Sequence, residues 1–150
     1  LSLCAVAKSH FVLQVPTNLG FDDDMESMAP CGGFNATTRT NVTDFPINGG
    51  DIGVLTTHPS VIWEYRAALV RNLTNWVSLT PKLNQTTGVG YLCEPEVPGV
   101  RKWIGEPAVL QLIQHGTDGD LYQCAAIKFV TGGPATVDPA CTNSTAFTAA

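Results

Sequence analysis

The chain has 150 residues, which suffices for one domain with a sizeable hydrophobic core but not for two of ordinary size. A formal net charge of −5 argues against binding to nucleic acid or to anionic lipid. Only 14% of the residues are charged, while 14 are Gly and 10 are Pro, a composition typical of short strands joined by turns. No apolar run is long enough to form a membrane-spanning helix.

Residues 1–9 are predicted to be the end of a signal peptide. The run "LSLCAVA" is apolar, and Ala7 and Ser9 fit the small-residue positions of a cleavage site. The alternative is a buried strand that begins at the first residue, but Lys8 and Ser9 would interrupt it. Cleavage after Ser9 makes His10 the first residue of the mature, secreted protein.

Several segments beyond this point alternate apolar and polar residues with the period of a β-strand. In chain order they are 10–16, a short segment ending near Thr57, 61–69, 108–116 and 121–130, the last two joined by the turn "GTDGD". Turn-rich pieces separate them, among them "FPINGGD", "LNQTTGVG" and "CEPEVPGV", and "ESMAP" is the only weakly helical fragment. We therefore predict an all-β fold, an antiparallel β-sandwich of the immunoglobulin-like or fibronectin-like type.

Glycosylation sequons and cysteines both support secretion. The chain has five Asn-x-Ser/Thr sequons where chance gives about one, which predicts glycosylated surface asparagines: Asn35, Asn41, Asn72, Asn84 and Asn143. Cys4 would leave with the signal peptide, so the remaining four cysteines predict two disulfides, with three pairings open: Cys31, Cys93, Cys124 and Cys141. No Cys-x-x-Cys pair occurs, which disfavours a zinc site.

A histidine at the mature N-terminus would offer a metal ion two nitrogens, its free α-amine and its ring Nδ1. His58, at the end of a predicted strand and before a proline, would supply a second imidazole. Three nitrogens in a tetragonal arrangement suit Cu(II), and the amine loses its proton readily because its ordinary pKa is about 8. The plainer alternative is that His58 is a hydrogen-bonded surface residue. His115, at a strand-to-turn edge, is expected to be a solvated loop residue without metal.

Other polar motifs indicate no further site. Three consecutive carboxylates, Asp22–Asp24, are expected to form a solvated turn rather than a calcium site. Glu26 is expected to tie down the loop that Cys31 anchors. The chain lacks a G-x-S-x-G motif and has no cysteine left over, so we expect no hydrolase chemistry and assign no catalytic residue.

The tryptophans bear on whether the protein could dock on a flat, crystalline substrate, which requires a face of exposed aromatic rings near the metal. Trp63 and Tyr65 alternate within one predicted strand and share a face, so at least one is expected in the core. Trp76 and Trp103 lie in less regular segments, where exposure is open.

The stretch "HFVLQVPTNLGFDDDMESMAPCGGF", followed by "HP" at 58–59 and by "DGDLYQCAAIKF", resembles the fungal copper proteins related to lytic polysaccharide monooxygenases. That family includes cell-surface copper acquisition factors. The resemblance covers residues 10–141 and implies a β-sandwich with a histidine brace, in which one Cu(II) ion takes the amine and ring of His10 and the ring of His58. It also implies an aspartate that reaches the copper, for which Asp118 and Asp120 are the candidates.

The same resemblance implies further features. It pairs Cys31 with Cys124 and Cys93 with Cys141. It makes 10–141 the copper-binding domain and 142–150 the start of a Ser/Thr-rich stalk, which in this family commonly leads to a lipid (GPI) anchor.

We therefore expect an extracellular, monomeric copper-binding protein of the cell surface that serves copper acquisition or homeostasis and is not an enzyme. It would buffer copper at the wall or pass it to a membrane copper transporter or reductase. Two alternatives stay open. One is a copper-dependent lytic polysaccharide monooxygenase, and the other is a structural wall or adhesion domain whose histidines bind nothing.

Overall fold

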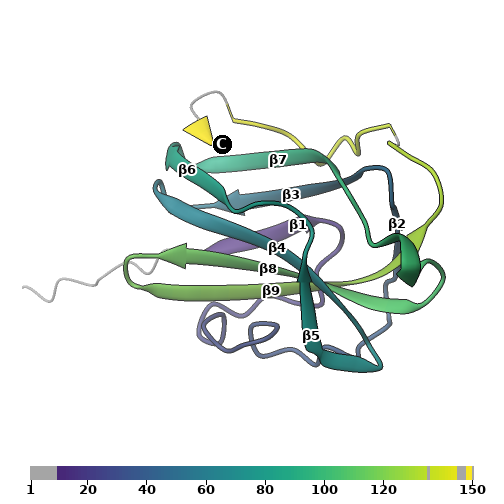
Figure 1. Cartoon of the computed structure of the whole chain (residues 1–150). Helices are drawn as coiled ribbons and strands as arrows, with labels where there is room; N and C mark the ends of the chain where they lie inside the picture. The colour runs from purple at the N-terminus through teal and green to yellow at the C-terminus, as the bar shows by residue number, and fades with distance from the viewer. Residues whose placement is uncertain (1–9, 135, 145–147, 150) are drawn as a thin grey trace, which may run out of the picture.

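Two β-sheets pack against each other around one core (Figure 1). The computed structural model describes residues 10–134, 136–144 and 148–149, so the predicted signal peptide, 1–9, lies outside the described residues. The smaller sheet has the order β1–β3–β7, formed by β1 (Phe11–Val15), β3 (Gly50–Thr56) and β7 (Gly90–Val97). The larger sheet has the order β10–β6–β4–β8–β9–β2, formed by β2 (Thr43–Pro46), β4 (Val61–Leu69), β6 (Leu83–Thr87), β8 (Pro107–Gly116), β9 (Gly119–Val130) and β10 (Thr148–Ala149), while β5 (Asn72–Ser78) also pairs with β4.

The predicted all-β sandwich is confirmed. Neighbouring strands pair antiparallel except β2 and β9, which run parallel, so the larger sheet is mixed. Within the described ranges, the only helical element is the single 3₁₀ turn Arg101–Trp103, and no helix there is long and apolar enough to cross a membrane.

The weak helical expectation for "ESMAP" is wrong. Met25 N–H donates to the Asp22 carbonyl and Met28 N–H to the Met25 carbonyl, which makes consecutive turns. The stretch ends in Pro30, and a proline disfavours helical geometry in the residue before it.

The five predicted strands are present, as β1, β3, β4, β8 and β9. Sequence reasoning missed β2, β5, β6 and β7: it assigned all of β6 and most of β7 to turns and gave β5 no assignment. Polar composition explains the miss of β6, whose only buried residue is Gln85. In β7, Pro95 and a positive φ of 59° at Glu96 interrupt the alternation on which strand prediction depends.

The core lies between the two sheets. Phe11 of the smaller sheet packs edge-on against Trp63 of the larger sheet, with ring centroids 5.0 Å apart. Trp63 and Tyr65 are both buried, which confirms the prediction for this strand face. Trp103 is buried as well, against Phe129, and Trp76 is half-buried with the Arg66 guanidinium 5.9 Å from its ring.

Both disulfides have the pairing that the resemblance implied. Cys31–Cys124 joins the loop after β1 to β9, and Cys93–Cys141 joins β7 to the C-terminal segment. The first bridge lies in a second apolar cluster with Val109, whose side chain points away from the main core because neighbours along a strand face opposite sides. The loop 17–38 thus covers the outer face of the larger sheet (Figure 1).

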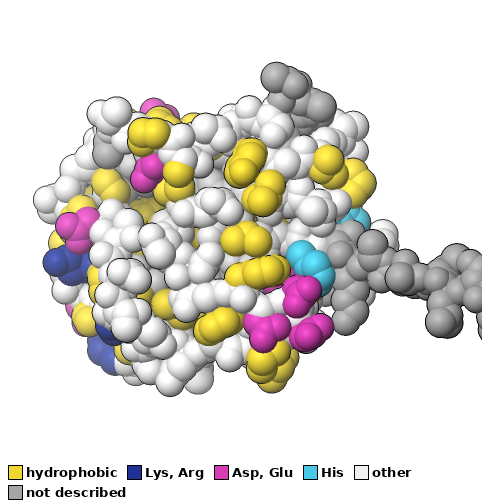
Figure 2. Space-filling model, turned by 180° about the vertical axis from the view of Figure 1, so that it is seen from behind, with side chains coloured by type: hydrophobic (Ala, Val, Ile, Leu, Met, Phe, Trp, Pro, Cys, Tyr) yellow, Lys and Arg dark blue, Asp and Glu magenta, His cyan; other side chains and the backbone are white. Residues whose placement is uncertain are grey.

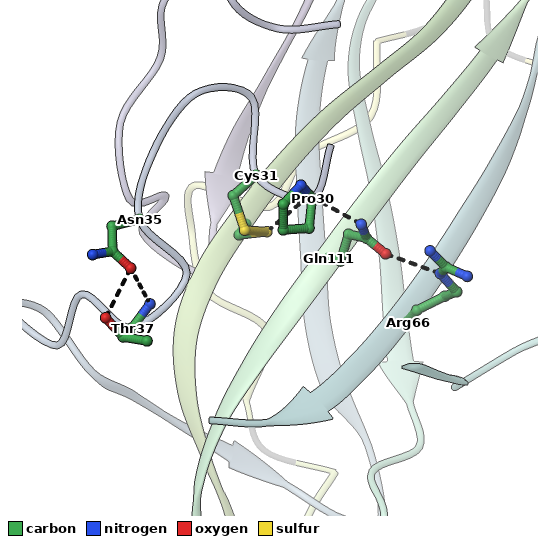
Figure 3. The surroundings of a disulfide bond; sticks show 7 residues. Pro30, Cys31, Asn35, Thr37, Arg66 and Gln111 are labelled. Atoms are coloured by element: carbon green, nitrogen blue, oxygen red, sulfur yellow. Dashed lines mark hydrogen bonds between the residues drawn. A yellow bond between two sulfur atoms is a disulfide. The ribbon is translucent and has the colours of Figure 1, made fainter. Parts of the chain in front are cut away.

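Hydrogen bonds also fasten the part of this loop that precedes Cys31. The Gln111 Nε2 group donates to the Pro30 carbonyl at 3.0 Å, and the Gln111 Oε1 atom accepts from Arg66 Nε at 2.9 Å (Figure 3). Tyr122 N–H on β9 donates to the Glu26 carbonyl at 2.8 Å. The loop therefore carries Glu26 to a fixed place beside the start of β1.

Candidate metal site

The pairing of β1 with β3 brings two distant histidines to one end of the smaller sheet. Phe11 lies opposite Thr56, so His10 lies opposite Thr57, the residue before His58. Thr57 N–H donates to the His10 carbonyl at 3.1 Å, and His10 N–H donates to Thr57 Oγ1 at 3.0 Å. The register of the two strands therefore brings the backbones of His10 and His58, marked in the sequence by "HF" and "HP", to the same end of the sheet.

The backbone of His58 is held on both sides by buried polar groups. Its N–H donates to Thr56 Oγ1 at 3.2 Å, and its carbonyl accepts from Gln85 Nε2 at 3.0 Å. Gln85 is itself oriented by Trp63 Nε1, which donates to its Oε1 at 2.9 Å. These bonds fix where the His58 ring leaves the sheet.

The β8–β9 hairpin places Asp118 beside His58. Asp118 lies in the turn between Gly116 and Gly119, with Oδ1 3.5 Å from His58 Nε2. Gly116 has no side chain to separate them, and a Cβ there would lie 3.0 Å from His58 Nε2 and 3.0 Å from Asp118 Oδ1. The space between the ring and the carboxylate exists because residue 116 is a glycine.

Asp120, the other candidate aspartate, is engaged elsewhere. His115 Nδ1 lies 2.8 Å from Asp120 Oδ1, and His115 Nε2 lies 2.6 Å from Glu64 Oε1. With both carboxylates ionised, the two bonds form together only when the ring carries both protons. His115 is thus a half-buried strand residue between two carboxylates, and the expectation of a solvated loop residue is wrong.

Glu26 reaches His10, which sequence reasoning did not predict. Its side chain is 1% exposed, and Oε1 lies 3.3 Å from His10 Nδ1. Desolvation by burial raises the pKa of Glu26 to about 7, although hydrogen bonds from Gln123 and from Phe11 N–H and the charge of His10 act in the opposite direction. The expected role as a loop anchor therefore accounts for only part of its contacts.

The ring nitrogens fit a metal ion. Nδ1 of His10 and Nδ1 of His58 are buried, and neither has a hydrogen-bond partner within the part of the chain that the structure describes. The 3.3 Å approach of Glu26 to His10 Nδ1 is an ion-pair distance without hydrogen-bond alignment. His58 faces the Asp118 carboxylate through its other ring nitrogen, Nε2, so the donor set that a first-row divalent ion would accept is His10 Nδ1, His58 Nε2 and Asp118 Oδ1.

The histidine and aspartate donors are not drawn together into one tight cluster. Among residues 10–134, 136–144 and 148–149, only Asp22, Asp23 and Asp24 place three such donor atoms within 4.8 Å of one another. Asp22 Oδ1 accepts the N–H of Asp24 at 3.0 Å, which agrees with the expected turn.

An acidic pocket of about 530 Å³ opens at this end of the molecule. Figure 2 shows acidic side chains gathered beside a histidine on this face. No Lys or Arg is among the residues that line the pocket, which are His10, Asp23, Asp24, Ser27, Asp118, Gly119, Asp120, Leu121 and Tyr122. Such a concentration of negative charge attracts cations.

Comparison with known proteins identifies the family of the chain. The model of the family described as copper acquisition factor BIM1-like matches residues 8–146. The chain therefore belongs to this family. The resemblance to fungal copper proteins related to the lytic monooxygenases is thereby confirmed.

Three fungal relatives show the range of the family. The lytic polysaccharide monooxygenase-like protein X325 of Yarrowia lipolytica is 29% identical over 99% of this chain and 59% of its own length. An uncharacterized protein of Aspergillus fumigatus is 31% identical over 99% of this chain and 65% of its own length. Copper acquisition factor BIM1 of Cryptococcus neoformans is 26% identical over 94% of this chain and 69% of its own length. The chain thus spans 59–69% of these relatives.

Proposed function

We propose that the chain captures one Cu(II) ion through a histidine brace. The free amine and Nδ1 of His10 and the ring of His58 are the nitrogen ligands. The observation that carries this proposal is the β1–β3 register, which sets His10 opposite the residue before His58. Membership in the BIM1-like family supports copper as the metal.

Asp118 is the aspartate that we assign to the copper. Its Oδ1 is the carboxylate oxygen that faces His58 Nε2, at 3.5 Å, whereas the Oδ1 of Asp120 is bonded to His115. A carboxylate ligand favours Cu(II) over Cu(I) through its negative charge, so the set is suited to holding the oxidised ion.

The surface around His10 fits a protein that captures copper and passes it on better than it fits an enzyme that oxidises polysaccharide. Trp63 and Trp103 are buried in the core and Trp76 lies under Arg66 on the outer face, so no tryptophan forms a platform beside His10. The exposed aromatic ring beside His10 is the single ring of Phe21, 6.2 Å from the His10 ring. The acidic pocket instead concentrates cations at the site. Reductant-dependent release of oxidised sugars by the copper-loaded protein would support the oxygenase alternative.

We further propose that the protein works outside the cell at its surface, glycosylated and held by a lipid anchor. It would there supply a membrane transporter or reductase. The asparagines of all five sequons are exposed. In two sequons the Thr hydroxyl donates to the Asn Oδ1 atom, at 2.8 Å for Thr37 to Asn35 and 2.7 Å for Thr74 to Asn72, which leaves the amide nitrogen accessible (Figure 3 for the first).

The ligand set is tested with protein that begins at His10, by chelator competition and EPR of bound Cu(II). His58→Ala should weaken binding by at least about tenfold and change the nitrogen hyperfine pattern, because it removes a ligand. Asp118→Asn should weaken binding more than Asp120→Asn.

His115→Ala is the matched control, since this histidine faces carboxylates rather than the pocket. It should leave the EPR spectrum unchanged, with folding checked by thermal unfolding. A His58→Ala variant that binds Cu(II) like the wild type would refute the assignment.

A further inference from the structure

Glu26 is the one carboxylate among the buried residues of the described chain. It is 1% exposed, and the other buried polar side chains are Thr or Gln. Burial of a carboxylate is costly unless polar or charged groups compensate for it. Among the described residues, the only basic group within 4.0 Å of this carboxylate is the His10 ring.

The contacts of Glu26 complete an open strand edge. Strand β1 lies at the edge of the smaller sheet, so every second N–H points away from β3. Two side chains take these groups: Phe11 N–H donates to Glu26 Oε1 at 3.3 Å, and Leu13 N–H donates to Gln123 Oε1 at 2.9 Å. Gln123 Nε2 then donates to Glu26 Oε2 at 2.6 Å. Glu26 and Gln123 stand where a neighbouring strand would stand.

The same carboxylate reaches the candidate metal site. Oε1 binds the N–H of Phe11, the residue directly after His10, and also lies 3.3 Å from His10 Nδ1. One oxygen therefore holds the backbone directly after His10 by a hydrogen bond and also lies next to the ring nitrogen assigned to copper. Its own backbone is fixed by Tyr122, which lines the pocket.

We propose that Glu26 is the positioning residue of the N-terminal histidine, holding its backbone and its Nδ1 edge in place for Cu(II). This inference rests on the proposed function. It adds Glu26, which lies outside the sequence motifs that contain the proposed histidine and aspartate ligands. Groups that orient metal ligands typically change metal affinity by about 10- to 100-fold when they are replaced.

The test uses protein that begins at His10, with Cu(II) alone as the probe. Glu26→Gln keeps the size of the side chain and should weaken Cu(II) binding by about 10- to 100-fold and broaden the EPR spectrum. Glu26→Asp keeps the charge but shortens the reach, and should give an intermediate affinity. Glu94→Gln is the control, because Glu94 is a half-buried carboxylate on β7 opposite Ile52, away from the end of β3 that meets His10. It should bind Cu(II) as the wild type does.

A metal-free measurement separates this inference from the proposed function. Amide hydrogen exchange should show faster exchange of Phe11 N–H in Glu26→Gln, with smaller changes in the amides that pair β3 with β7. If the wild type takes up no copper at His10, the proposed function fails. The exchange rate of Phe11 N–H still tests whether Glu26 holds the backbone beside His10. If copper affinity, EPR spectrum and Phe11 exchange all stay at wild-type values in folded Glu26→Gln and Glu26→Asp, the role of Glu26 is overturned.

Discussion

Gly116 sets how closely the β8–β9 turn approaches His58. The φ of Gly116 lies outside the left-handed region, so the backbone itself does not demand glycine. The demand is steric, because a Cβ would stand 3.0 Å from both the His58 ring and the Asp118 carboxylate. Gly116 therefore leaves room for the His58 ring and the Asp118 carboxylate to approach each other.

Gly116→Ala should therefore impair metal binding more than folding. The added methyl group pushes His58 Nε2 and Asp118 Oδ1 apart, and we expect a loss of Cu(II) affinity of about tenfold. Thr117→Ala is the control in the same turn, because Thr117 is exposed and its truncation adds no atom near His58. Competition binding measures the affinity and thermal unfolding measures the fold. Equal affinity of Gly116→Ala and Thr117→Ala would contradict the steric role of this position.

Glu64 stabilises the neighbouring strand pair through His115. Burial opposes ionisation of Glu64, but the hydrogen bond from His115 and the charges of Lys82, His115 and Arg66 outweigh it and hold the pKa of Glu64 below its ordinary value. Below the ordinary carboxyl pKa, the unfolded chain therefore binds a proton at Glu64 more readily than the folded chain. The stabilisation is complete above that ordinary pKa and is lost as the pH falls through the lowered pKa.

Glu64→Gln should lower the free energy of unfolding at pH 7 by about 1.5–3 kcal/mol, the range for a hydrogen bond to a charged group. The deficit should shrink as the pH falls toward 3, because the wild type then loses the same contribution. Urea unfolding at the two pH values measures both differences. A deficit that is constant or larger in acid would contradict this account of the network.

At the scale of elements, the C-terminal segment closes the second edge of the smaller sheet. Ser144 N–H donates to the Tyr91 carbonyl at 2.8 Å, and Asn143 Oδ1 accepts Cys93 N–H at 2.8 Å. The Cys93–Cys141 disulfide fastens this segment to β7. Edge β7 is therefore covered by chain, as edge β1 is covered by the side chains of Glu26 and Gln123.

Replacing Cys93 and Cys141 together by Ala should destabilise the fold and spare the metal site. The bridge spans 48 residues, and a loop of that length corresponds to about 4 kcal/mol of unfolding free energy in the chain-entropy model. Cu(II) affinity should stay near the wild-type value under conditions where the variant is folded, because the segment lies on β7 rather than at the pocket. Guanidinium unfolding and competition binding test the two parts. A large loss of affinity in the folded variant would show that this element shapes the site.

The elements that could be predicted from the sequence are those with regular alternation. Val61–Leu69 buries alternate residues over most of its length and was predicted with its observed bounds. Strand β5 leaves all of its residues exposed or half-buried, so its pattern carries little signal. Strand β10 lies within the segment expected to be a stalk, and its two residues pair with β6. Such edge pairing depends on tertiary contacts that no local pattern records.

The candidate site was predictable where a motif marked it. His10 and His58 stand out because of a predicted cleavage site and a proline, and the structure brings their backbones to one sheet end. The choice between Asp118 and Asp120 depends on which carboxylate His115 binds, which the spacing of the turn does not reveal. The approach of Glu26 to His10 depends on how loop 17–38 folds onto β9, a contact between distant segments.

At the scale of the whole molecule, the features that support the proposed function lie at one end of the sandwich. The acidic pocket, the two unpartnered ring nitrogens and the buried Glu26 all lie where β1, β3 and the β8–β9 turn meet. The two disulfides hold the loop 17–38 and the C-terminal segment against the sheets, and so stabilise the part of the fold that carries the pocket. This arrangement suits a protein that receives a cation from solution and releases it to a partner.

The proposed copper site depends on a free amino group at His10, which supplies a ligand that a peptide nitrogen cannot. Its most direct test compares Cu(II) affinity of protein that begins at His10 with protein that retains Ser9 ahead of it. We predict one tightly bound Cu(II) in the first and an affinity weaker by orders of magnitude in the second, with the same thermal stability without metal. Equal affinity of the two proteins would contradict the brace.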